Sequence, residues 1–88
     1  MDKSPFSKEY KIFIELLKEQ RMQAGVTQSD LAGALQEKQS FISKCERGER
    51  RLDIIELHNF CNAIGLSLTV FTKELEKRLS DIEAADES

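Results

Sequence analysis

Apolar side chains recur every three or four residues along most of the chain, which is the spacing of one face of an α-helix. Five such stretches occur, and no alternating strand pattern of comparable length accompanies them. In the first, the apolar positions are Phe6, Tyr10, Phe13, Ile14 and Leu17. Ser4 and Pro5 precede this stretch as a helix cap and a first helical residue, and Gly25 follows as a stop. The spacing therefore predicts a long first helix.

Two short helices follow. Thr27 and Asp30 have the spacing of a capping box, which predicts a second helix from Thr27 to about Leu35. A third runs from about Lys38 to Arg47 and is closed by Gly48, with Ile42 and Cys45 turned inward.

A fourth helix is predicted from about Asp53 to Ala63, and Gly65 stops it. Its apolar stripe consists of Ile54, Leu57, Phe60, Cys61 and Ile64. A fifth is predicted from about Ser67 to Leu79. Residues 81–88 are too polar to pack and are expected to form a frayed acidic tail. The chain is therefore expected to be one all-α domain of residues 1–88, with its core in residues 5–80.

The two short helices carry the functional signal. Isolated helices of fewer than about 12 residues are marginal in water, so these two must pack against the longer ones. A small residue, Ala32, lets the second helix cross closely over the third, and Ile42 fills the angle between them. The outer face of the third helix is then polar, and it consists of Gln39, Ser40, Ser43 and Lys44. Such side chains can hydrogen-bond to base edges in the major groove of DNA, while arginines at 47, 50 and 51 would hold the backbone.

The charge distribution agrees with this reading. The net charge is −3, but residues 18–52 carry seven Lys/Arg against five Asp/Glu, a balance of +2. Residues 73–88 carry three Lys/Arg against six Asp/Glu, a balance of −3. For nucleic-acid binding, the charge of the surface that contacts the nucleic acid matters more than the net charge of the whole chain.

Composition excludes several other classes of protein. A single histidine, His58, cannot complete a Ser-His-Asp or Cys-His set, and no glycine-rich phosphate loop is present, so an enzyme is not expected. Cys45 and Cys61 have no metal-ligand spacing and are expected to be reduced core residues. We therefore expect no metal and no cofactor. No apolar run of about 18 residues and no signal-peptide pattern occurs, so a cytoplasmic protein without membrane association is expected.

Residues 26–32 and 39–51 together resemble the Cro/repressor-type helix-turn-helix family, also called the XRE or lambda-repressor-like family. Ala32, Ile42 and the run Glu46-Arg47-Gly48 fit its pattern, and the resemblance extends over about residues 12–72. It implies a compact five-helix domain whose second and third helices form the helix-turn-helix of a bacterial or phage-type regulator.

The resemblance also assigns roles to individual residues. Arg21 and Glu46 match an ion pair that ties the first helix to the recognition helix. Gln28 matches a position that touches a phosphate or an edge base. The expected DNA-binding residues are Gln28, Lys38, Gln39, Ser40, Ser43, Lys44, Arg47, Arg50 and Arg51.

Three positions depart from the family pattern. Gln36 stands where a turn glycine is frequent, which leaves open whether the backbone there is left-handed. Lys38 is a poor helix cap. Phe41 is large for its position, and it either packs against the fourth helix or touches a thymine methyl group.

The fifth helix is more apolar than the core of a small domain requires. Self-association through Leu68, Val70, Phe71, Leu75 and Leu79 is therefore predicted, and the alternative is that these residues only complete the monomer core. A homodimer would present two recognition helices about 34 Å apart to an inverted-repeat operator in double-stranded DNA. The expected function is that of a sequence-specific transcriptional regulator, a homodimer that acts as a repressor, or as a repressor and activator, of nearby promoters, with its own promoter as one candidate target. The alternative is a helix-turn-helix interaction module with a protein partner, such as an antitoxin or a restriction-modification controller.

Overall fold

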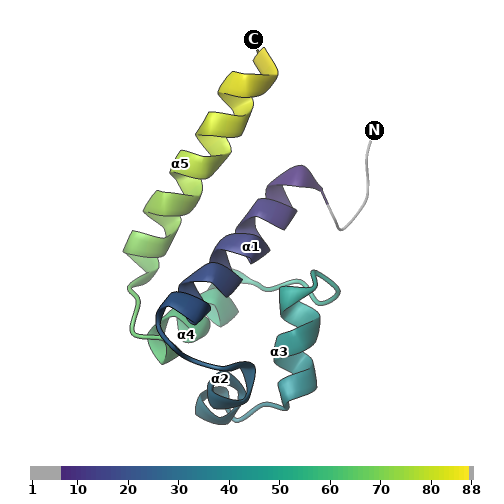
Figure 1. Cartoon of the computed structure of the whole chain (residues 1–88), viewed down its shortest axis with the longest axis vertical. Coiled ribbons are helices and arrows are strands. Elements are labelled where there is room, and N and C mark those ends of the chain that lie inside the picture. The colour runs from purple at the N-terminus through teal and green to yellow at the C-terminus, as the bar shows by residue number, and fades with distance from the viewer. Residues whose placement is uncertain (1–6, 88) are drawn as a thin grey trace.

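The computed structural model describes residues 7–87, which form five helices (Figure 1). The helices are α1 (Lys8–Gln23), α2 (Gln28–Leu35), α3 (Gln39–Glu46), α4 (Ile54–Ala63) and α5 (Leu68–Glu87). No strand occurs among the described residues, so the all-α, five-helix prediction is confirmed. The predicted start of the first helix at Ser4 and Pro5 lies outside the described residues.

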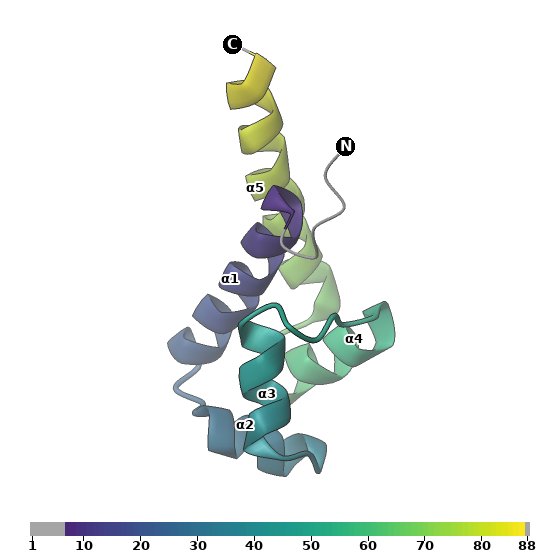
Figure 2. The ribbon, with the colours of Figure 1, turned by 90° about the vertical axis from the view of Figure 1, so that its right-hand side faces the viewer.

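The two long helices, α1 and α5, lie along one another, and the three shorter helices gather at one end of this pair (Figures 1 and 2). α3 packs against α1 and α2, and α4 packs against α2 and α5. The core that these contacts enclose consists of Leu16, Leu17, Leu31, Ala32, Ile42, Cys45, Leu57, Phe60, Cys61 and Phe71. α2 and α3 therefore rest on a framework built by the longer helices, as short helices require.

Local signals fix most of the helix ends. Thr27 and Asp30 form the predicted capping box at the start of α2, and Asp53 forms another with Glu56 at the start of α4. Lys38 precedes α3 without a side-chain cap. The turn between α2 and α3 is closed by Gln36, whose φ of 57° is left-handed. This resolves the question raised by the missing glycine, because the glutamine adopts the conformation that the turn demands.

Two sequence-based predictions are wrong at helix ends. Ile54 was expected in the buried stripe of α4, yet it is 57% exposed. It lies in the first turn, at the end of α4 that projects away from the other helices (Figure 2), and burial begins only at Leu57. α5 ends at Glu87, not near Leu79. No glycine or proline follows Gly65, and Ile82 continues the apolar spacing, so nothing in the sequence stops the helix at residue 80.

Both cysteines are buried thiols, as expected for small core residues. Burial raises the pKa of the Cys45 thiol to about 11, and it also raises the pKa of Cys61.

Among the described residues, no single helix is long and apolar enough to cross a membrane. α4 and α5 reach that length and hydropathy only together, across a bend of 113°.

Two glycine substitutions of the same size should change stability in opposite directions. Gly33 lies inside α2 with open space at the position of a Cβ, so Gly33→Ala should stabilise the fold by about 0.5–1 kcal/mol. Gly25 also has open space but has φ +74°, so Gly25→Ala should destabilise by about 1–2 kcal/mol. Urea denaturation measures both, and an equal change in the two variants would contradict the backbone argument.

Candidate DNA-binding surface

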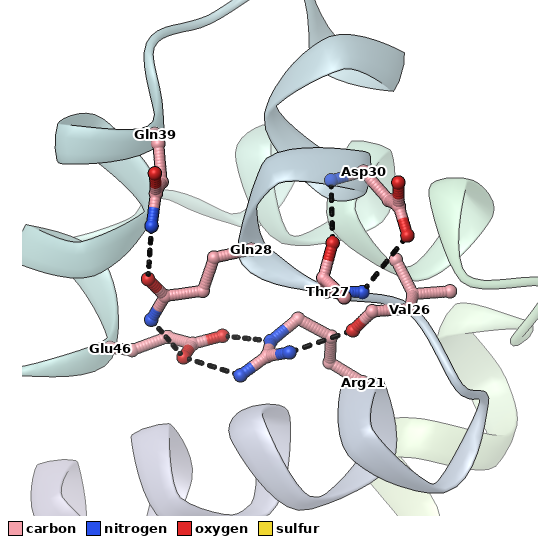
Figure 3. Close-up of polar contacts among 7 residues, drawn as sticks. All are labelled: Arg21, Val26, Thr27, Gln28, Asp30, Gln39 and Glu46. Atoms are coloured by element: carbon pink, nitrogen blue, oxygen red, sulfur yellow. Dashed lines mark hydrogen bonds and ion pairs between the residues drawn. The ribbon is translucent and has the colours of Figure 1, made fainter.

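A buried ion pair joins α1 to the end of α3. Arg21 Nε donates to Glu46 Oε2 at 2.6 Å, and Arg21 Nη2 donates to Glu46 Oε1 at 3.0 Å. The two side chains are 9% and 3% exposed. Arg21 Nη1 also donates to the carbonyl oxygen of Val26 at 2.7 Å (Figure 3). The ion pair expected from the sequence is therefore present, and it additionally fixes the turn before α2.

Two glutamines extend this pair to the start of α3. Gln28 Nε2 donates to Glu46 Oε1 at 2.9 Å, and Gln39 Nε2 donates to Gln28 Oε1 at 3.3 Å. Figure 3 shows the chain of side chains running from Arg21 through Glu46 and Gln28 to Gln39. Gln28 is half-buried, whereas Gln39 is exposed. Gln28 thus orients Gln39, which is a role that the sequence did not predict for it.

The outer face of α3, called here the reading face, consists of Gln39, Ser40, Ser43 and Lys44. Gln39, Ser40 and Lys44 are exposed, and Ser43 is half-buried. Lys38, just before the helix, is also exposed. The structure thus brings these predicted residues together on one accessible side of α3.

Arg47 lies at the end of the reading face and is held there by its neighbours. Its Nη1 donates to Ser43 Oγ, and its Nε donates to Glu49 Oε2 at 2.7 Å. The hydrogen bond from this guanidinium lowers the pKa of the Glu49 carboxyl. Both side chains are about half exposed, so this pair is open to exchange with a phosphate.

The two arginines of the loop after α3 have different partners. Arg50 donates to both oxygens of Glu56, at 2.9 and 2.7 Å, and lies over the Phe41 ring at 5.2 Å from its centroid. Arg51 lies over the Tyr10 ring at 4.1 Å. Arg50 therefore anchors the loop to α4, and Arg51 rests against α1.

The position of Phe41 settles one of the alternatives left open by the sequence. Its ring packs against Phe60 of α4 with centroids 6.3 Å apart. Phe41 is half-buried and belongs to the margin of the core. Packing against the fourth helix is thus its role in this structure.

Two residues that shape this surface were not identified from the sequence. Glu56 holds Arg50, and Tyr10 supports Arg51 while its hydroxyl accepts the Leu52 N–H at 3.2 Å. The spacing of Asp53 and Glu56 is a capping-box signal that could have placed Glu56 beside the loop. Tyr10 is 42 residues away from Leu52 in the chain, and no local pattern reports such a contact.

The residues predicted for a dimer interface do not share one face of α5. Phe71 is 1% exposed and forms part of the monomer core, so its assignment to an interface is wrong. Leu68 and Leu75 pack partly against the core, and Val70 is 57% exposed. At about 100° per residue, Val70 lies about 180° around the helix from Leu79.

The part of the chain that the structure describes contains no group of three His, Cys, Asp or Glu side chains arranged to hold a metal ion. The polar clusters around α3 consist of hydrogen-bond donors and acceptors that interact with each other or face solvent. Their chemistry suits recognition of a polar surface.

Comparison with known proteins gives consistent matches. A helix-turn-helix family model matches residues 17–71. An XRE-family like protein from Pseudomonas syringae pv. tomato str. DC3000 is 44% identical, over 81% of this chain and 87% of that chain, with a TM-score of 0.76. A search of curated proteins found no match.

Two further solved structures are similar. The restriction-modification controller protein C.Esp1396I, as a tetramer with its natural 35-base-pair operator, is 31% identical over 81% of this chain and 93% of that chain, with a TM-score of 0.73. The clp gene regulator ClgR from C. glutamicum is 26% identical over 78% of this chain and 88% of that chain, with a TM-score of 0.69.

Removing one partner of the Arg21–Glu46 pair should be far more damaging than removing both. Arg21→Met leaves a buried carboxylate without its counter-charge, so it should lower the free energy of unfolding by about 3–5 kcal/mol. The double variant Arg21→Met/Glu46→Gln should be destabilised by less than Arg21→Met alone, because it leaves no unpaired buried charge. Urea denaturation of all four proteins measures this coupling.

Arg47→Met serves as the control, because it breaks an ion pair that is about half exposed and should leave stability close to wild type. Additive effects of Arg21→Met and Glu46→Gln would show that the buried pair is not energetically coupled.

Proposed function

The chain belongs to the XRE family of helix-turn-helix DNA-binding transcription regulators, and from this premise we propose that it is a sequence-specific, homodimeric repressor. In this proposal α3 enters the major groove and its reading face contacts base edges. Such a protein acts on double-stranded DNA in the cytoplasm. Its target is an inverted-repeat operator, and one such operator lies at the promoter of its own gene.

The observation that carries this proposal is the hydrogen-bond chain that ends at Gln39. The Gln39 amide group reaches Gln28, and Gln28 is held by the buried carboxylate of Glu46. A glutamine whose orientation is fixed before binding can make a paired contact to adenine N6 and N7 with less loss of side-chain entropy. Preorganisation of this kind favours base reading over contact with the DNA backbone alone.

The basic residues around α3 fall into two groups, those suited to contact DNA and those that hold the loop after α3 in place. Lys38, beside the reading face, and Lys44, on it, are both exposed and are suited to phosphate or base contacts. Arg47, at the end of α3, can exchange Glu49 for a phosphate. Arg50 forms an ion pair with Glu56, so we propose that its main role is to hold the loop in place and that contact with DNA is its secondary role.

We propose that the dimer forms through the half of α5 that extends beyond the core. Leu79 and Ile82 are partly buried, yet they lie outside the core cluster. A shallow groove beside them is lined by Thr69, Thr72, Lys73, Leu75, Glu76, Leu79, Ser80 and Glu83. A second α5 placed in this groove would cover Leu75 and Leu79 and relate two recognition helices by a two-fold axis.

The similarity to C.Esp1396I supports a second, narrower candidate, which is control of restriction-modification genes. This chain would then act on its operator as a tetramer. A restriction or methylation gene beside its own gene would support this candidate over a general repressor.

Selection of random duplex DNA by the purified protein tests the proposed function. We expect an inverted repeat with half-sites about one helical turn apart to be enriched. Weak binding without an enriched sequence would leave only backbone contacts and would contradict the proposal.

Substitutions at the two glutamines should separate base reading from positioning. Gln39→Ala should cost about 1–3 kcal/mol on the selected site and relax the preference at one base pair. Gln28→Ala should relax the preference at the same base pair to a smaller degree, because Gln39 remains but is no longer oriented. Competition binding against all single-base variants of the site measures both. A loss of preference at different positions in the two variants would refute the positioning role.

Charged substitutions on two faces of α5 test the dimer. Leu79→Glu should convert the dimer to monomer and reduce affinity for the full operator while leaving affinity for an isolated half-site unchanged. Val70→Glu, on the opposite face of the same helix, should leave the dimer intact. Sedimentation equilibrium gives the oligomeric state, and dissociation caused by Val70→Glu but not Leu79→Glu would place the interface elsewhere.

A further inference from the structure

A groove runs between α1 and the end of α3, next to the reading face, and Arg47 is the one residue of its lining that was predicted to bind DNA. Its lining consists of Lys11, Ile14, Glu15 and Lys18 of α1 with Glu46 and Arg47. Ile14 is buried at its base, while the side chains of Lys11, Glu15, Lys18 and Arg47 are exposed. We call it the α1–α3 groove.

The groove carries an excess of positive charge. Glu46 is already neutralised by Arg21, and Arg47 shares its charge with Glu49. Among the described residues, Lys11 and Lys18 make no ion pair and no side-chain hydrogen bond. Glu15, which lies between them, is the opposing carboxylate.

The two lysines are also well placed along α1. They are seven residues apart, which is two helical turns on the same face and about 10 Å along the axis. A lysine ammonium is a compact point charge with three rotatable donors, and it binds phosphate without a fixed geometry. A pair of such groups along one groove suits a polyanion that runs lengthwise past it.

We propose that the α1–α3 groove binds backbone phosphates of the DNA that flanks the half-site read by α3. The inference rests on the proposed function, because the groove is continuous with the reading face through Arg47, which borders both. A strand contacted at Arg47 passes directly from the reading face toward Lys18 and Lys11. The contact is independent of sequence and lengthens the footprint of each protomer beyond the bases that it reads.

Duplex length and salt dependence together test the groove. The site recovered by selection is placed in a duplex that ends at its outermost base pair, and in one extended by about ten base pairs, or one turn, on each side. For the wild-type protein, the slope of log affinity against log salt concentration should be steeper on the extended duplex.

Lys11→Gln and Lys18→Gln should each reduce this slope by about 1 on the extended duplex and leave it unchanged on the short one. The matched control is Lys77→Gln, which removes one exposed charge from α5, a helix that packs against α1 and α4 and not α3. It should leave both slopes unchanged. Glu15→Gln should tighten binding to the extended duplex, because it removes the opposing carboxylate.

Three outcomes would overturn the inference. Equal slope reductions on the two duplexes would show a general charge effect, and slopes that match the Lys77→Gln control would show that flanking phosphates do not reach the groove. In both cases wild-type recognition of the selected site persists, so the proposed function stands. A wild-type protein that bound no duplex would overturn the proposed function and the groove together.

Discussion

The buried pair of Arg21 and Glu46 is the interaction on which the geometry of the surface depends. One guanidinium contacts the end of α3 through Glu46 and the turn before α2 through the Val26 carbonyl, while it belongs to α1. Burying two charges is costly unless their hydrogen bonds are satisfied, and replacing such a pair by apolar residues is often neutral. The benefit of the pair is therefore one of orientation, because its three hydrogen bonds hold α1, the end of α3 and the turn before α2 in fixed relative positions.

A second constraint acts on the loop that follows α3. Arg50 with Glu56 and Arg51 with Tyr10 fasten this loop to α4 and α1 respectively. The arginines of this surface are thus mostly used to hold its shape, since a planar guanidinium binds a carboxylate or a ring in a fixed orientation. Lys38 and Lys44 are exposed and have no such fixed partner among the residues that the structure describes, so they are better suited to bind phosphates. On this surface, arginines therefore maintain the shape of the loop, and lysines supply charge for binding phosphates.

How much of this was predictable from the sequence depends on how far apart the interacting residues are. Capping boxes, glycine stops and the apolar spacing are local, and they placed α2 and α3 to within a residue or two. The Arg21–Glu46 pair came from the family resemblance and not from spacing. The bond between Gln28 and Gln39 and the contact of Arg51 with Tyr10 depend on how helices cross, which periodicity does not report. Ile54 was wrongly predicted to be buried, because periodicity gives the direction of a side chain but not the point at which a helix extends beyond the helices that pack against it.

A chain with a net charge of −3 can bind DNA because of where its acidic residues lie. The acidic residues between positions 74 and 87 lie mainly in the part of α5 that extends away from α2 and α3 (Figure 1), in a molecule 44 Å long. The Debye length is about 10 Å at 0.1 M salt, so most of that charge is screened from the reading face. Near α3, two acidic residues, Glu46 and Glu49, are already paired with arginines. The polarised distribution also orients the protein as it approaches a polyanion, since the acidic end is repelled and the basic end is drawn toward the phosphates.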